Sequence, residues 1–62
     1  MRAYSCFIKD RRYATPVLSF IFARDAGRAR ELACRELMES PHAVSFELCE
    51  DGHLILMEFR AA

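Results

Sequence analysis

Apolar and polar residues alternate along this chain in four short runs, and one further segment spaces its apolar residues as a helix does. The four runs cover residues 3–9, 16–23, 43–50 and 53–60, and they are rich in the aromatic and aliphatic residues that pack well in strands. Polar residues, proline or glycine separate them. The pattern predicts an α+β domain of four mainly antiparallel strands, arranged as two hairpins on either side of one helix.

The segment between the two hairpins, residues 25–39, has helical spacing. Asp25 is the expected N-cap, because its carboxylate can accept hydrogen bonds from the free amides of the first turn. Proline at position 41 pushes the preceding residue out of the α region and ends the helix. The apolar residues form one stripe, made of Ala26, Ala29, Ala33 and Leu37. Because this stripe is mostly alanine, we expect the helix to lie close to a sheet whose aromatic residues supply most of the core.

The closing hairpin carries the clearest turn signal. Asp51-Gly52 favours a two-residue turn, since both residue types tolerate positive φ. With these two residues in the turn, Glu50 faces His53. The pairs that follow on the expected helix side are Leu48 with Ile55, Phe46 with Met57, and Val44 with Phe59. On the other face, Cys49 pairs with Leu54, Glu47 with Leu56, and Ser45 with Glu58.

This register predicts a sheet that is apolar on both faces, which one helix cannot cover. The candidate interface on the uncovered face consists of Leu54, Leu56, Cys49, Val17 and Ile21, the last two depending on the strand order. The sequence leaves that order open, because the helical crossover permits more than one arrangement. A contiguous apolar patch marks a protein contact. We therefore predict a homodimeric interaction module, with an antitoxin-like component of a protein complex as one alternative.

The length of the chain supports the need for a partner. Residues 1–62 form one small domain, and a domain of this size usually gains stability from disulfides, a metal or oligomerisation. Nine basic and nine acidic side chains balance, so no net field attracts nucleic acid or a membrane surface. The apolar fraction of 53% is too high for a disordered chain.

The cysteines and the N-terminal residues indicate a cytoplasmic protein. Cys6, Cys34 and Cys49 are odd in number and lack paired spacing, so a disulfide framework is not expected and reduced thiols fit better. The residues after Met1 do not resemble a signal peptide. The apolar run 17–23 is too short to span a bilayer.

The sequence offers little for catalysis or metal binding. Cys49 and His53 have CxxxH spacing, but the hairpin register places the two side chains on opposite faces, and zinc needs converging ligands. Phosphate-binding loops and nucleophile motifs are missing from the sequence. We expect no enzyme activity, no metal and no cofactor.

A second alternative is a small nucleic-acid-binding or regulatory protein. Its candidate contacts are Lys9, Arg11, Arg12 and Tyr13, and the helix arginines Arg24, Arg28 and Arg35 would extend them. Basic and aromatic side chains in one loop can contact phosphates and stack on bases. Acidic residues are interleaved with them, however, whereas nucleic-acid modules usually show a basic excess.

The whole chain resembles a group of short bacterial proteins of unknown function that are common in alphaproteobacteria. The residues that carry the resemblance are the aromatic first strand Tyr4 to Ile8, Asp25 followed by the alanine-rich helix, and Phe46-Glu47-Leu48-Cys49 with Gly52 in the last hairpin. This sequence departs from the group by having Cys49 where tryptophan is usual and no glycine in its first turn. The resemblance implies a ββαββ fold and no particular activity or site residue.

Overall fold

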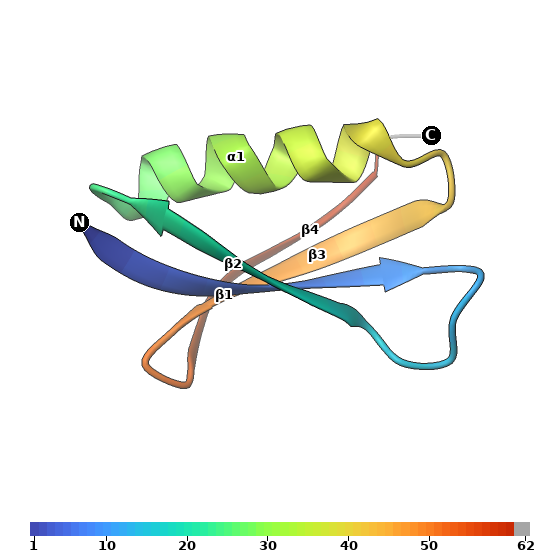
Figure 1. The fold of residues 1–62 in the computed structure, drawn as a ribbon, viewed down its shortest axis with the longest axis horizontal. Coiled ribbons are helices and arrows are strands. Elements are labelled where there is room, and N and C mark those ends of the chain that lie inside the picture. The colour runs from blue at the N-terminus through green and yellow to red at the C-terminus, as the bar shows by residue number, and fades with distance from the viewer. Residues whose placement is uncertain (61–62) are drawn as a thin grey trace.

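The computed structural model describes residues 1–60 and contains one four-stranded sheet and one helix. Along the chain the elements are β1 (Arg2–Asp10), β2 (Val17–Ala23), α1 (Ala26–Glu39), β3 (Ala43–Glu50) and β4 (His53–Phe59). Neighbouring strands are antiparallel throughout. The helix lies along one side of the sheet (Figure 1). The predicted α+β fold is confirmed, and each predicted element lies within one residue of the observed one.

The strand order is β2-β1-β3-β4, which the sequence had left open. After the first hairpin, α1 carries the chain across β1, and β3 then pairs with the free side of β1. The two strands β1 and β3 therefore occupy the centre of the sheet. β2 and β4 form its two edges.

Side chains close both ends of the helix. At the start, the Asp25 carboxylate accepts a hydrogen bond of 2.9 Å from the backbone amide of Arg28, as predicted for an N-cap. At the end, the Arg60 guanidinium donates to the carbonyls of Leu37, Ser40 (2.5 Å) and Ala43 (3.0 Å). The last carbonyls of a helix have no partner within it. Arg60 therefore ties the end of β4 to the end of the helix.

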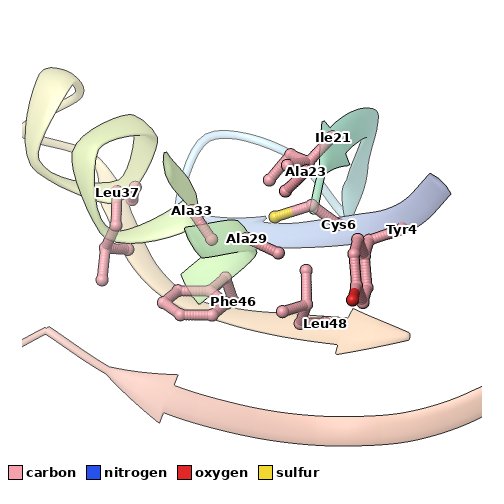
Figure 2. Packing of buried hydrophobic residues seen from close by; sticks show 10 residues of the cluster. Tyr4, Cys6, Ile21, Ala23, Ala29, Ala33, Leu37, Phe46 and Leu48 are labelled. Carbon is pink, nitrogen blue, oxygen red and sulfur yellow. The ribbon is translucent and has the colours of Figure 1, made fainter. Parts of the chain in front are cut away.

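The core lies between the helix and one face of the sheet. Its largest fully buried side chains are Tyr4, Phe46 and Leu48, all of which belong to strands. The helix contributes Ala29, Ala33 and Leu37 (Figure 2). Since alanine adds little bulk, the helix approaches the sheet closely and the strands fill the space. This division of the core is the one predicted from the alanine stripe.

The turn of the last hairpin forms as predicted. Asp51 and Gly52 both have positive φ, 51° and 77°. Glu50 pairs with His53, and Cys49 pairs with Leu54. This part of the predicted register is confirmed.

Beyond that point the predicted register of β4 is wrong by one residue. A β-bulge places Ile55 as an extra residue, so that Leu48 pairs with Leu56. The pairs that follow are Phe46 with Glu58, Glu47 with Met57, and Ser45 with Phe59. Because side chains alternate between faces, one extra residue moves every later side chain of β4 to the opposite face. Leu56 thereby joins the core, while Met57 and Phe59 turn away from it.

The orientation of β2 follows from its pairing with β1. Ile21 pairs with the buried Tyr4 and is itself only 5% exposed under the helix. Ser19 shares this face and donates a hydrogen bond of 3.0 Å to Glu36 of the helix. The alternate residues of β2, which include two phenylalanines, therefore point away from the core.

Candidate protein interface

The sheet face opposite the helix carries large apolar side chains along both of its edges. On β2 these residues are Leu18, Phe20 and Phe22, and on β4 they are Leu54, Met57 and Phe59. Each of the six is between 48% and 66% exposed. No helix or loop of residues 1–60 covers this face (Figure 1). We call it the open face.

The centre of the open face is lined by smaller side chains. Phe7 is the exception: it lies on β1, pairs with Leu18 and Glu47, and is partly buried between them. The other apolar or uncharged residues at outward positions of β1 and β3 are Ala3, Ser5, Ser45 and Cys49. These residues join the two apolar edges, so the open face is one continuous surface rather than two separate strips.

The open face is large for a protein surface that stays in water. At about 200 Å² per large apolar side chain, the six edge residues together expose roughly 700 Å². The largest apolar patch of an ordinary monomer is about 300–600 Å². A standard protein interface buries about 800 Å² on each partner. By this measure the open face has the size of an interface.

Among residues 1–60, two charged residues occupy outward strand positions on the open face. Lys9 lies on β1 opposite Ser45, and Glu47 lies on β3 opposite Phe7. Both are exposed. The face therefore carries one charge of each sign, close to its centre.

The structure places the five predicted interface residues on different faces. Leu54 and Cys49 lie on the open face, as expected. Ile21 is buried in the core, Leu56 packs against the core, and Val17 pairs with Ile8 on the helix side. The prediction that Ile21, Leu56 and Val17 line the uncovered face is wrong. The bulge at Ile55 explains Leu56, and the pairing of β2 with β1 explains the other two.

Sequence reasoning missed most of the open face. It did not identify the outward residues of β2, nor Met57 and Phe59 on β4. Both faces of β2 read as apolar, so alternation alone cannot show which one is buried. A signal did exist in β4, because four consecutive apolar residues at positions 54–57 break the alternation of a strand with one buried face.

The structure brings together three of the four predicted nucleic-acid contacts. Arg11, Arg12 and Tyr13 lie in the loop after β1, whereas Lys9 lies on the open face. Arg12 makes hydrogen bonds of 3.0 and 2.8 Å to the two carboxylate oxygens of Asp10, and its guanidinium lies 5.1 Å from the centre of the Tyr13 ring. These bonds from Arg12 lower the pKa of Asp10 to about 2, so the carboxylate stays ionised beside the guanidinium. The positive charge of Arg12 is thus matched locally.

Three arginines in the helix or just before it have acidic neighbours as well. Arg28 contacts Glu31 at 3.1 Å, and Arg30 pairs with Glu58 of β4. Arg24 lies 3.6 Å from Asp25. These pairs offset the charges of Arg24, Arg28 and Arg30, whereas Arg35 is exposed and has no ion pair among residues 1–60.

A cavity of about 530 Å³ lies between the loop after β1 and the C-terminal part of α1. Its apolar wall includes Ile8 and Val17, and its two carboxylates belong to Asp10 and Glu36. Both carboxylates already accept hydrogen bonds, from Arg12 and Ser19 respectively. Neither cysteine nor histidine lines the cavity in the described part of the chain.

The thiols and histidines do not converge on a reactive centre. Burial, helped by the negative charge of Glu36, raises the pKa of the Cys6 thiol to about 11, which keeps it protonated and unreactive. Cys49 pairs with Leu54, whereas His53 pairs with Glu50, so the two lie on opposite faces of the hairpin. Within residues 1–60, no three His, Cys, Asp or Glu side chains gather in a group that could hold a metal ion.

No helix among the described residues combines the length and apolar character needed to cross a membrane. A scan of known protein families finds no match to the chain. Comparisons with curated proteins and with solved structures find no significant match either. The resemblance to short alphaproteobacterial proteins stays a prediction, because none of these comparisons tests it.

Proposed function

We propose that this protein is a non-enzymatic, cytoplasmic interaction module that forms a homodimer through its open face. The observation that carries the proposal is the set of six large apolar side chains, each at least 48% exposed, on a sheet face without a covering element in the described chain. Free cysteines fit a reducing compartment. Stacking two open faces would produce a helix-sheet-sheet-helix arrangement with an apolar centre, the packing used by β-sandwiches.

Three properties of the open face favour a second copy as its occupant. Its apolar area is close to what a standard interface buries on each side. Its single positive and single negative residue, Lys9 and Glu47, allow the face to be complementary to itself, as a two-fold interface requires. The chain has no net charge, so two copies do not repel each other.

Nucleic acid fits the open face less well. Exposed phenylalanines can stack on bases, but binding to a nucleic acid also needs cations for the phosphates. In the described part of the chain, Lys9 is the only basic residue at an outward strand position of this face, and Glu47 balances it. Arg12, the central residue of the basic loop, is bound to Asp10. The homodimer therefore agrees better with the distribution of charge.

Multi-angle light scattering of two matched variants tests the homodimer. Phe20 on the open face is 64% exposed, and Met38 on the helix is 68% exposed. Phe20→Lys should convert the dimer to monomers at tens of micromolar, because a lysine would be buried in an apolar interface without a partner. Met38→Lys adds the same charge outside the open face and should leave the dimer intact.

The two variants also separate association from folding. Both replace exposed side chains, so both should keep the circular dichroism of a folded α+β protein. A wild-type chain that is monomeric at tens of micromolar would refute the proposal. So would a Phe20→Lys variant that stays folded and dimeric.

A further inference from the structure

We propose that Lys9 and Glu47 set the alignment of the dimer, with Lys9 of each protomer paired with Glu47 of the partner subunit. This inference rests on the proposed homodimer and adds the contact that orients its two halves. It concerns the only two charged side chains at outward strand positions of the open face. They have opposite signs and lie on the two central strands.

Both charges lack an ion-pair partner within residues 1–60. Some charged residues on the other side of the molecule are paired: Arg2 bonds Glu50 at 2.6 Å, and Arg30 pairs with Glu58. Lys9 and Glu47 are diagonal neighbours on adjacent strands, because Lys9 pairs with Ser45 and Glu47 pairs with Phe7. Even so, the structure shows no ion pair between them. Each is free to meet a partner from another molecule.

A simple symmetry brings the two charges together across the interface. The two-fold axis lies in the interface, parallel to the strands and midway between β1 and β3. Rotation about it stacks the two open faces directly on each other and places β1 of one protomer over β3 of the partner subunit. Glu47 of the partner subunit then lies over Phe7, its own pairing residue. Lys9 is two residues further along β1, which places it about 7 Å away along the strand and about 10 Å away across the gap between the stacked sheets. The lysine and glutamate side chains, each extended toward the other, together span this separation, and the two-fold axis forms the contact twice.

Burial makes these two contacts selective. In an apolar interface an unpaired charge is costly, while a charge that meets its opposite is compensated. Any alignment that slides the faces apart removes both contacts between the subunits, and it leaves Lys9 and Glu47 only as diagonal neighbours in their own protomer, where the structure shows no ion pair. The apolar residues therefore supply the area of contact, and the two ion pairs select one alignment among many.

Exchange of the two charges provides the test. Lys9→Glu gives a face with two negative charges, and Glu47→Lys gives a face with two positive charges. Each variant alone should dimerise at least about tenfold more weakly than the wild type, because like charges meet across the axis. An equimolar mixture of the two should form a heterodimer of near wild-type affinity. The double variant should again form a homodimer.

Attraction between oppositely charged molecules could imitate this result, so a matched control is needed. Glu39 is exposed at the end of the helix, outside the open face. Glu39→Lys changes the net charge as Glu47→Lys does. It should dimerise normally by itself, and its mixture with Lys9→Glu should show no tight heterodimer.

The outcomes distinguish this inference from the proposed function. If wild type and Met38→Lys are dimers but both charge variants dimerise as tightly as wild type, the alignment proposal is wrong and the homodimer stands. If both charge variants weaken but their mixture does not recover, the pairing of Lys9 with Glu47 is also wrong. If the wild type is a monomer, the proposed function itself fails.

Discussion

Two buried polar side chains, Tyr4 and Asp10, have opposite effects on the stability of this small core. Tyr4 is fully buried, and its hydroxyl has no hydrogen-bond partner among the described residues. Asp10 is 5% exposed, yet its carboxylate accepts three hydrogen bonds from Arg12, one of them from the backbone amide at 2.8 Å. One polar group therefore opposes folding and the other supports it. The Asp25 cap was predictable because it precedes a segment with helical spacing. The Asp10–Arg12 bonds are just as local, but the first turn has no glycine to indicate its geometry, so the sequence did not predict them.

Replacing Tyr4 with phenylalanine should stabilise the protein. The substitution removes a hydroxyl that loses its water on folding and gains no partner, a penalty of about 1–3 kcal/mol. The aromatic ring and its packing stay in place. We expect Tyr4→Phe to raise the free energy of unfolding by about 1 kcal/mol, measured by urea denaturation at fixed protein concentration. A loss of stability of similar size would mean that the hydroxyl has a partner.

The Asp10 carboxylate should make stability depend on pH in the acid range. Hydrogen bonds from Arg12 lower its pKa from 3.8 to about 2 in the folded protein. A lowered folded pKa contributes stability that is fully present above the unfolded value and is lost as the pH falls through the folded one. Wild-type stability should therefore decline between about pH 4 and pH 2.

Asp10→Asn is the variant that isolates this effect. It should be less stable than wild type near neutral pH, and the difference should shrink as the pH falls toward about 2. Urea denaturation at several pH values measures both trends. A difference that is constant over this range would exclude Asp10 as the source.

The positions of the strands and the helix in the sequence were largely predictable. Which face of β2 and of β4 is buried was not. The alternation of apolar residues, the Asp51-Gly52 turn and the alanine stripe each act over a few residues, and the elements they predict all formed. The bulge at Ile55 depends on how β4 fits against β3 and the helix. In β2, both faces are apolar, and only pairing with β1 buries Ile21 instead of Phe20. For these reasons the sequence predicted an uncovered apolar sheet face but named several wrong residues for it.

Neighbouring residues of β4 provide a direct test of the bulge. Leu56 packs against the core, whereas Met57 is 48% exposed on the open face. Leu56→Asp should lower the free energy of unfolding by at least about 2 kcal/mol. Met57→Asp should keep the native circular dichroism and weaken association. The opposite order, with Met57→Asp unfolded and Leu56→Asp folded, would support the register without a bulge.

The molecule as a whole has a thin core and a large exposed apolar face. Its helix contributes mainly alanine to the buried cluster. A domain of this length buries only about 60% of its unfolded surface. Covering the open face would add to the core what the helix does not provide. In that case folding and dimerisation are coupled, and the stability of the protein rises with its concentration.

Sedimentation equilibrium of the wild-type protein tests whether the chain forms a homodimer. Over a concentration range from about one to one hundred micromolar, a homodimer held by the open face predicts a mass that rises toward twice that of one chain. Phe20→Lys run beside it should remain at the mass of one chain. A wild-type mass equal to one chain at every concentration would contradict the account.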